Sequence, residues 1–272
     1  MTTPDHIRAA RELLAFYAEA GVDALLGEEP VDRLSAAQIE SAPAPAPRAE
    51  LPRPALPLRA APEIAPGAPT TPEVAVMAAR EAARSAASLH ELRDILLKFE
   101  GCALRTTAKQ LVFADGNPQA RVMFVGEAPG REEDLEGLPF VGRSGKLLDL
   151  MLAAIGIDRG GAYIANIIPW RPPGNRTPTP QESQICLPFI QRQIELANPD
   201  VLVCLGGPST QTLLGVKEGI KRTRGKWFAF HTGTREIRAV ATFHPAYLLR
   251  SPLEKRFAWR DFLAIKKALG AS

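Results

Sequence analysis

The chain has 272 residues, 46% of them hydrophobic, and a formal net charge of +3, a length that supports one α/β domain of about 170–200 residues with a smaller appendage. No apolar run approaches the roughly 18 residues of a membrane helix, and the N-terminus lacks the basic and apolar regions of a secretory signal, so we expect neither. Three widely spaced cysteines cannot form a disulfide framework and suit a reducing cytosol, which predicts a cytoplasmic protein.

The first 72 residues are predicted to lie outside the main domain. Apolar residues recur at roughly helical spacing over 4–28, which predicts a helical segment within residues 1–40. This segment contains eight acidic and three basic residues. Ten prolines among residues 41–72 predict an extended Pro/Ala-rich linker, because proline lacks the N–H that helices and sheets require. The segment 1–40 is expected either to bind a protein partner or to be a simple appendage.

Residues 73–272 are predicted to form one domain, led by a helix at 73–99. Four short apolar runs predict buried strands, and helical patterns alternate with them. The strands are expected at 122–125, 163–168, 201–205 and 237–243, and the helices at 144–155, 180–196, 209–214 and 253–269. This alternation predicts a mostly parallel sheet that is covered by helices on both faces.

Turn residues with polar or ionisable groups follow each predicted strand. The first strand runs into 126–130, the second into Asn166 and the proline-rich segment 169–176, the third into 206–209, and the fourth into His244. Functional residues of such sheets lie at the carboxyl ends of the strands. We call the segment at the carboxyl end of each strand its exit, and we expect the four exits to converge on one crevice.

The first exit and the loop after it offer two candidates for chemistry. Glu127 follows a glycine turn, where a carboxylate can polarise water or balance a developing cation, with bracing of the loop as the alternative. Phe140 lies in a proline–glycine loop and could stack on a flat ring, with a core position as the alternative. A phosphate-binding P-loop is rejected, because Phe140 stands where G-x-x-x-x-G-K requires glycine and Leu147 replaces its Ser/Thr.

The second exit offers an amide and two guanidinium groups. Asn166 has one acceptor and two donors, which match a nucleobase edge that carries an imide N–H and a carbonyl. Capping of the strand end is the alternative. Arg171 and Arg176 lie in a stiff, proline-rich loop, where they are expected to contact a phosphate backbone at little entropic cost.

The fourth exit offers a histidine followed by an apolar and basic segment. His244 can donate a hydrogen bond to a developing oxyanion, although a lone histidine is often structural. Leu248 or Leu249 could wedge into a base stack, and Arg250 could hold a phosphate. Residues 217–260 contain eleven basic and three acidic residues, which favours nucleic acid as the partner, with a solvated basic face as the alternative.

Four motifs together resemble those of family 4 of the uracil-DNA glycosylase superfamily, over roughly residues 95–270. They are Gly-Glu-Ala-Pro-Gly at 126–130, Gly-Leu-Pro-Phe-Val-Gly at 137–142, Asn166 ahead of Arg-Pro-Pro-Gly-Asn-Arg at 171–176, and His244-Pro245 with Leu-Leu-Arg at 248–250. The resemblance implies a three-layer α/β/α sandwich with a central four-stranded parallel sheet. It also implies a monomeric, monofunctional enzyme that flips uracil out of single- or double-stranded DNA and hydrolyses its N-glycosidic bond.

The resemblance implies a role for several side chains. Phe140 would stack on the flipped uracil, Asn166 would read its imide edge, and His244 would donate to its O2. Glu127 is the carboxylate available to activate water, because Ala128 stands where the best-known relatives carry Asp. Gly126 and Ala128 are expected among the substrate contacts, and the expected DNA contacts are Arg171, Arg176, Ser209, Leu248, Leu249 and Arg250.

The cysteines depart from the family pattern. Family 4 enzymes usually hold a [4Fe–4S] cluster on four cysteines, and the corresponding positions here are Phe99, Cys102, Trp170 and Cys186. Such a cluster needs four thiolates, whereas Cys204 lies inside a predicted strand and reads as a core residue. Phe99 and Trp170 are bulky and apolar, which suits them to filling the vacated space. We therefore expect no iron–sulfur cluster and no other cofactor.

Two rival functions fit parts of the pattern. A non-catalytic sensor of uracil or abasic DNA would use the same DNA-facing residues. A small nucleotide-binding or hydrolase domain would bind free nucleotides with weak salt dependence, whereas DNA binding falls steeply with salt.

Overall fold

The computed structural model describes residues 72–270. Contacts within the chain divide it into two units, residues 1–63 and 64–272, and the described residues belong to the second. The helical segment predicted at 1–40 lies outside the described residues, as does the linker predicted at 41–72 except for Pro72, which begins a helix. Among residues 72–270, no helix is both long and apolar enough to cross a membrane.

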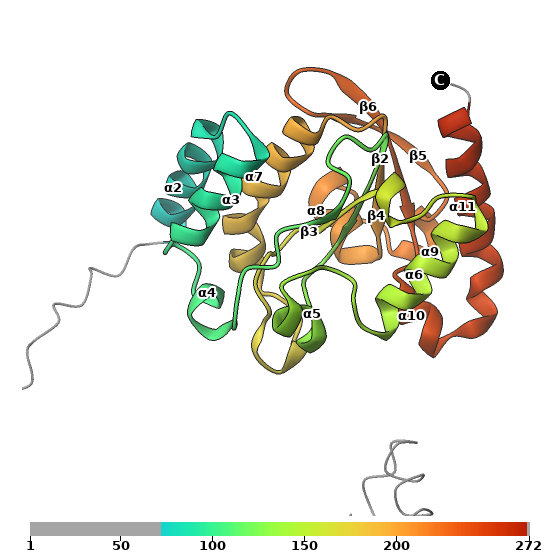
Figure 1. Cartoon of the computed structure of the whole chain (residues 1–272), viewed down its shortest axis with the longest axis horizontal. Helices are drawn as coiled ribbons and strands as arrows, with labels where there is room; N and C mark the ends of the chain where they lie inside the picture. Colours follow the sequence, from blue (N-terminus) through green and yellow to red (C-terminus); the bar gives the residue numbers. More distant parts are fainter. Residues whose placement is uncertain (1–71, 271–272) are drawn as a thin grey trace, which may run out of the picture. The chain divides into compact units, whose positions relative to one another are not determined.

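A six-stranded sheet forms the middle layer of the domain, with the strand order β1-β3-β2-β4-β6-β5 (Figure 1). Its four central strands run parallel. They are β3 (Tyr163–Asn166), β2 (Val122–Gly126), β4 (Val201–Leu205) and β6 (Glu236–Thr242). These strands correspond to the four predicted apolar runs, so the expected parallel core is confirmed.

Two antiparallel edge strands extend the sheet beyond the prediction. The two-residue strand β1 (Asp115–Gly116) pairs with β3, and β5 (Trp227–His231) pairs with β6. The turn between β5 and β6 contains Gly233 at φ 103°, a conformation that glycine adopts without steric cost. Because β5 is only partly buried, it has no apolar run of the kind that marks the central strands.

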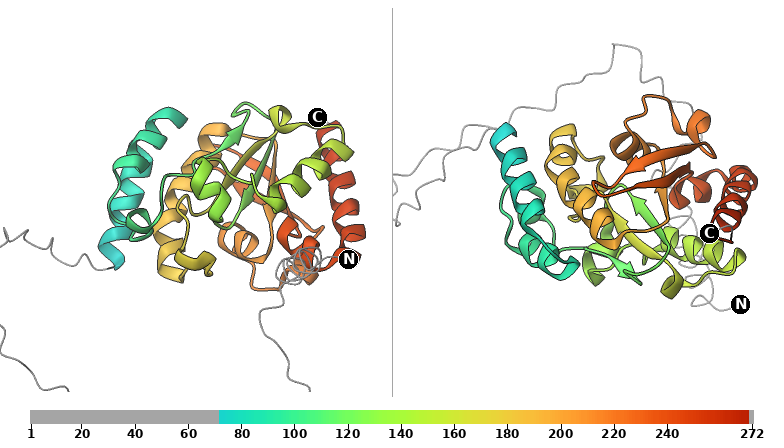
Figure 2. Two further views of the ribbon diagram at one scale, coloured as in Figure 1. Left: turned by 60° about the horizontal axis from the view of Figure 1, so that its bottom comes forward. Right: turned by 90° about the horizontal axis from the view of Figure 1, so that it is seen from above.

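Alternate residues of the central strands face two different helical layers. Met123 and Val125 of β2 pack in one cluster with helices α2 (Pro72–Ser85), α3 (Leu89–Lys98) and α7 (Pro180–Ala197). Val122 and Phe124 pack in a second cluster with α6 (Arg143–Ala154) and α11 (Lys255–Gly270). Figure 2 shows these two helical layers on either side of the sheet. The three-layer α/β/α architecture is therefore confirmed.

Short helices occupy the connections between these layers. They are α4 (Leu104–Thr107), α5 (Arg131–Glu136), α8 (Gly207–Leu214), α9 (Ile220–Thr223) and α10 (Pro245–Arg250), with 3₁₀ turns η1 (Arg159–Gly161), η2 (Pro173–Asn175) and η3 (Pro252–Glu254). Of these, α5, α10 and η2 lie next to the site described below.

The single helix predicted at 73–99 is in fact two helices, α2 and α3. Ser88 begins the second helix, and its hydroxyl accepts a hydrogen bond from the Glu91 N–H at 3.2 Å. The Glu91 carboxylate in turn accepts one from the Ala87 N–H at 2.7 Å. This reciprocal Ser-x-x-Glu capping satisfies backbone donors that a continuous helix would have paired internally. The break lets both helices pack against α7.

The exits of β2 and β3 are joined by backbone hydrogen bonds. The N–H groups of Ile167 and Ile168 donate to the carbonyl oxygens of Gly126 and Glu127, each at 3.0 Å. The strand predicted at 163–168 therefore ends at Asn166, but its pairing with the neighbouring chain continues for two residues. This pairing fixes the first and second exits side by side.

Candidate active site

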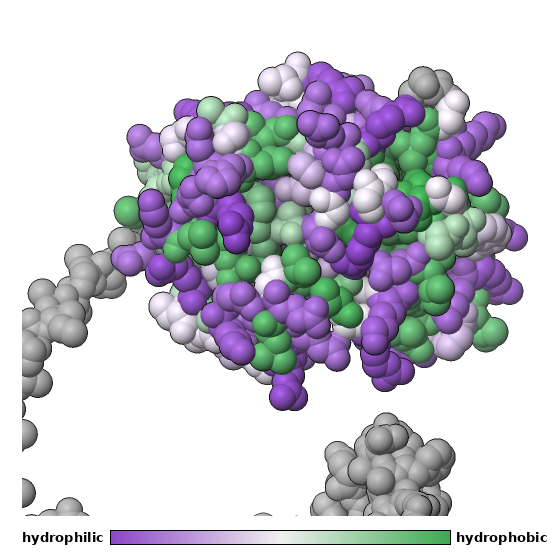
Figure 3. All heavy atoms as spheres, viewed as in Figure 1, coloured by the Kyte–Doolittle hydropathy of each residue, from purple (hydrophilic) through white to green (hydrophobic). Residues whose placement is uncertain are grey.

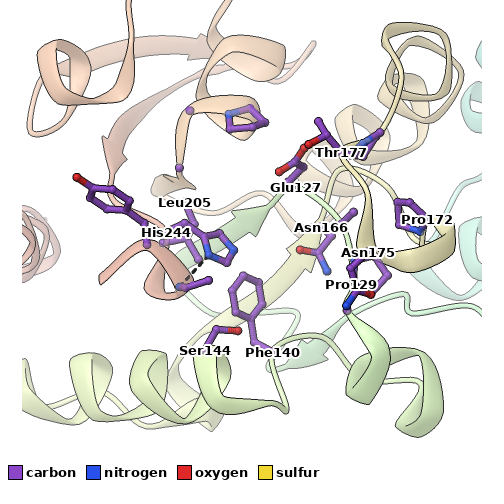
Figure 4. A pocket seen from close by; sticks show the side chains of 18 of the residues that line it. Glu127, Pro129, Phe140, Ser144, Asn166, Pro172, Asn175, Thr177, Leu205 and His244 are labelled. Atoms are coloured by element: carbon purple, nitrogen blue, oxygen red, sulfur yellow. Dashed lines mark hydrogen bonds between the residues drawn. The ribbon is translucent and has the colours of Figure 1, made fainter. Parts of the chain in front are cut away.

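A pocket of about 660 Å³ lies at the carboxyl end of the parallel strands. All four central strands contribute to its lining, through Glu127 after β2, Asn166 of β3, Leu205 of β4, and His244 after β6. Phe140 and the loop at 172–178 complete the wall. The predicted convergence of the four strand exits is therefore confirmed (Figure 4).

Asn166 brings a buried amide into this pocket. The residue is 5% exposed, and no group among residues 72–270 hydrogen-bonds to its Oδ1. A buried acceptor without a partner costs about 1–3 kcal/mol, so this oxygen is suited to a ligand that donates a hydrogen bond. Gly126 makes room for the amide, because a Cβ at residue 126 would overlap Asn166 Oδ1 and lie 2.7 Å from the Phe140 ring.

Phe140 places its ring between the amide and the imidazole. Its ring centroid lies 5.4 Å from that of His244, with the planes inclined by 31°, and Figure 4 shows Asn166 and His244 on either side of the ring. The backbone of Phe140 has φ 55°, which is unusual for a residue with a side chain. The ring is buried in the pocket wall.

Two contacts hold the backbone of Phe140 in this conformation. Arg159 donates hydrogen bonds to the carbonyl oxygens of Phe140 and Pro139, while it pairs with Asp115 and Asp149. Gly145 of α6 packs directly on the Phe140 carbonyl, where a Cβ would overlap it. The loop predicted to present an aromatic ring is thus anchored from two sides.

His244 is held in one tautomer. Its Nδ1 accepts a hydrogen bond from the Ala246 N–H at 3.1 Å, drawn as the dashed line in Figure 4, so the ring proton of the neutral imidazole lies on Nε2. Burial, reinforced by the nearby positive charge of Arg250, lowers the pKa of His244 to about 4. The side chain is therefore a neutral hydrogen-bond donor at physiological pH.

Glu127 supplies a carboxylate to the same pocket. The side chain is half-buried, and this burial raises its pKa. Figure 4 shows it farther from the Phe140 ring than Asn166 and His244 are. Ala128 follows it in the wall of the pocket, so Glu127 is the acidic side chain of this motif that faces the cavity.

A second carboxylate, which the sequence did not single out, organises the site. Glu133 is buried, and it accepts hydrogen bonds from the N–H groups of Gly130, Val141 and Gly142 at 3.0–3.1 Å. It thereby ties the exit of β2 to the loop that carries Phe140. The sequence signal was a Gly-x-x-Glu pattern at the start of α5, but three consecutive acidic residues at 132–134 concealed that the last two are buried and that Glu133 is the one bonded to the Phe140 loop.

Two of the predicted DNA contacts face the interior, and these predictions are corrected. Ser209 is fully buried, and its hydroxyl donates to the Gly206 carbonyl at 3.2 Å. Leu248 is 1% exposed and packs with Phe243 and Ala258. Neither side chain is placed to reach DNA. Leu249 is half-buried instead, and it lines a groove beside the pocket.

The two arginines of the 169–176 segment are already engaged within the protein. Arg176 lines the pocket and forms two hydrogen bonds to Glu182, at 2.9 and 2.6 Å. Arg171 donates to Asn175 at 2.7 Å and lies 3.8 Å from Asp134. A phosphate would have to compete with these partners.

The fold and the pocket define an α/β protein whose strand exits present an amide, an imidazole and an aromatic ring to one cavity. A family model described as the uracil DNA glycosylase superfamily matches residues 113–263. The chain therefore belongs to the uracil-DNA glycosylase superfamily.

Curated relatives identify the branch. The type-4 uracil-DNA glycosylase of Archaeoglobus fulgidus is 38% identical over 187 residues, which cover 67% of this chain and 94% of that protein. The type-4 enzyme of Thermotoga maritima is 44% identical over 155 residues, or 57% of this chain and 79% of the relative. That of Saccharolobus solfataricus is 38% identical over 189 residues, or 68% and 88%. The chain is thus a type-4-like member of the superfamily.

The residues at the four positions expected to hold an iron–sulfur cluster do not fit such a cluster. Cys102 and Cys186 are buried with their Sγ atoms 4.0 Å apart, and the Cys186 thiol donates a hydrogen bond to Cys102. That bond lowers the pKa of Cys102 and raises the pKa of Cys186. Phe99 and Trp170 pack in the same apolar cluster, and a [4Fe–4S] cluster takes four thiolates. Among residues 72–270, no group of three or more His, Cys, Asp or Glu side chains is arranged to hold a metal ion.

Cys204 lies in β4 within the core, as predicted. Burial raises the pKa of its thiol to about 12.

Proposed function

We propose that this protein removes uracil from DNA by hydrolysing the N-glycosidic bond, and that it leaves an abasic site. The observation that carries the proposal is the unpaired Oδ1 of Asn166, buried beside Phe140 and His244. Uracil presents an imide N–H, two carbonyl groups and a flat ring, and these three features match an amide, a neutral donor and an aromatic surface. Membership of the superfamily supports the same chemistry.

The flipped base would be bound by three side chains. Its ring would stack on Phe140, the imide N–H would donate to Asn166 Oδ1, and the amide nitrogen of Asn166 would donate to O4. His244 would donate from Nε2 to O2. Flipping costs a few kcal/mol, which these contacts would offset.

His244 would assist departure of the base. As the bond between C1′ of the sugar and N1 of uracil breaks, its electron pair passes to uracil, and negative charge develops on O2. A neutral imidazole whose Nδ1 is already occupied donates its remaining N–H to that oxygen without any prior proton transfer. Donors fixed in advance at a developing anion are a major source of catalysis.

Glu127 would complete the reaction. Its carboxylate would balance the electron-poor sugar and orient a water molecule, whose oxygen bonds to C1′ while the carboxylate takes up the released proton. The raised pKa of Glu127 suits it to this role as a base. No lysine nucleophile is required, so we infer a monofunctional enzyme with no lyase step.

The setting of the enzyme is also part of the proposal. We infer a cytoplasmic monomer that acts on uracil in single- or double-stranded DNA, with residues 1–40 available to a protein partner. We further infer that the chain works without an iron–sulfur cluster, since two of four thiolates are replaced. A brown preparation that absorbs near 400 nm and contains about four irons per chain would overturn this inference.

The test is excision from a labelled uracil oligonucleotide, with thymine as the matched control. We expect strand cleavage only after alkali, because an abasic site is alkali-labile and a glycosylase without lyase activity leaves the strand intact. Binding without alkali-dependent cleavage would identify the rival sensor. The same assay on U:G, U:A, single-stranded uracil, hypoxanthine and xanthine would define the substrate range.

A further inference from the structure

The pocket lined by Phe140, Asn166 and His244 is called the base pocket below. A groove of about 580 Å³ opens beside it. The two cavities share several wall residues, including Gly130, Ser144 and Arg250, so a ligand can extend from one into the other. Figure 3 shows the lower edge of the molecule, over α5 and α10, hollowed between two hydrophilic lobes.

Three arginines line this groove: Arg131 at the start of α5, Arg143 at the start of α6, and Arg250 at the end of α10. All three side chains are exposed, and within residues 72–270 none forms an ion pair or a hydrogen bond. They contrast with Arg171 and Arg176, which have acidic or amide partners.

The groove also contains two carboxylates, which must be weighed against the arginines. Glu133 is buried and accepts hydrogen bonds from three backbone N–H groups. Glu132 is exposed and lies near Gly142. Three guanidinium groups outnumber the two carboxylates, so the groove carries a net positive charge. Leu249 adds an apolar surface between them.

We propose that this groove binds the phosphodiester backbone of the strand that carries the flipped nucleotide, immediately beside the lesion. The inference rests on the proposed function and adds Arg131 and Arg143 to its DNA contacts. Guanidinium groups bind phosphate oxygens in a planar, two-pronged manner, and the shared wall brings them next to the base pocket. Leu249 then lies where the neighbouring base would stack.

The proposal places phosphate contacts on α5 and α6, next to the proline-rich loop, whose Asn175 also lines the groove. The sequence placed phosphate contacts on Arg171, Arg176 and Arg250, and partners within the protein occupy the first two. An arginine without a partner binds phosphate without first breaking an ion pair, so the α5–α6 side offers the lower energetic cost.

The test compares Arg131→Gln, Arg143→Gln and the double variant with the wild type. KM and kcat for a uracil oligonucleotide are measured from 50 to 200 mM salt, single-stranded and in duplex, conditions over which phosphate contacts dominate the salt dependence. We expect KM to rise roughly tenfold for each variant at low salt, with kcat within about twofold. The slope of log KM against log salt should fall by about 0.7 per arginine for single strands and about 0.9 for duplex.

Two further variants serve as controls. Arg80→Gln removes an exposed arginine of α2, far along the chain and in a different helical layer, and it should leave KM and the salt slope unchanged. Arg143→Lys keeps the charge, so it should keep most of the salt slope. Thermal unfolding of each variant checks the fold.

An unchanged slope in the double variant, or an equal loss in Arg80→Gln, would overturn the groove assignment. A fall in kcat at unchanged KM would overturn it as well. The proposed function fails separately, if the wild type does not release uracil from the same oligonucleotide.

Discussion

The base pocket and the corner around Cys102 and Cys186 are both built from family motifs, yet they differ in hydrogen bonding. In the pocket, Asn166 Oδ1 is buried without a partner, and His244 has one ring nitrogen free. In the cysteine corner, one thiol donates to the other, and Phe99 packs edge-on against Phe189 at 4.9 Å. The first region has hydrogen-bonding atoms open to a ligand, whereas the second pairs its two thiols with each other inside an apolar cluster.

The largest effect is expected at the imidazole. His244→Ala removes the donor to the developing anion, and loss of one such donor lowers kcat by about 10²–10³-fold. Single-turnover excision of uracil under saturating enzyme measures this change. DNA affinity should stay within a few-fold, because the contact strengthens only as the bond breaks. A variant that retained a tenth of the wild-type rate would remove His244 from the mechanism.

A loss of about a hundredfold in excision is expected for Asn166→Ala. Two hydrogen bonds to the base edge disappear, each worth about 1–1.5 kcal/mol. The same change should not lower the melting temperature, because the buried oxygen that it deletes has no partner in the free protein. Calorimetry and an excision assay on one sample measure the melting temperature and the rate. A clear drop in melting temperature would mean that Asn166 has a structural role.

The rate of uracil excision should fall at acidic pH because Glu127 becomes protonated, whereas His244 stays neutral. The lowered pKa of His244, about 4, keeps the imidazole neutral as pH falls from 8 to 5. Burial raises the pKa of Glu127, so this carboxylate gains a proton first, and the rate should fall by about tenfold per pH unit below that pKa. In Glu127→Gln the rate should be low and flat over this range. If the rate of Glu127→Gln still fell toward acidic pH, a group other than Glu127 would be responsible for the pH dependence.

The smallest effect is expected in the cysteine corner. Cys186→Ala loses a thiol–thiol contact and a little apolar volume, which should lower the free energy of unfolding by about 1–2 kcal/mol. Uracil excision should match that of the wild type. Chemical denaturation and the oligonucleotide assay give the two values. A loss of activity without a loss of stability would show that the thiols serve the reaction.

The sequence predicted most of what depends on buried strands. Continuous apolar runs mark parallel strands that are covered on both faces, and the residues that follow them, such as Asn166 and His244, had to emerge at one edge. The short edge strands were not predicted, because β1 has two residues and β5 is held by its pairing with β6.

The sequence did not predict which side chains of the short helices face the interior. Helix α8 begins two residues earlier than predicted, and its phase turns Ser209 inward. Leu248 and Leu249 are adjacent and chemically alike, and the packing of α10 against α6, with Phe243 and Ala258, buries the first of them. Likewise, the sequence does not show that Glu133 binds the N–H groups of Gly130, Val141 and Gly142, whereas Asp134 binds those of Lys109 and Gln110.

The backbone bonds from Ile167 and Ile168 to Gly126 and Glu127 bear on any attempt to redesign the enzyme for another damaged base. They connect the segment after Asn166, the proposed reader of the base, to the segment that carries Glu127, the proposed activator of water. Insertions or deletions in either segment would shift both, and would alter selectivity and turnover at once. Directed evolution toward a new substrate is therefore better confined to side-chain exchanges that leave these two backbone hydrogen bonds intact.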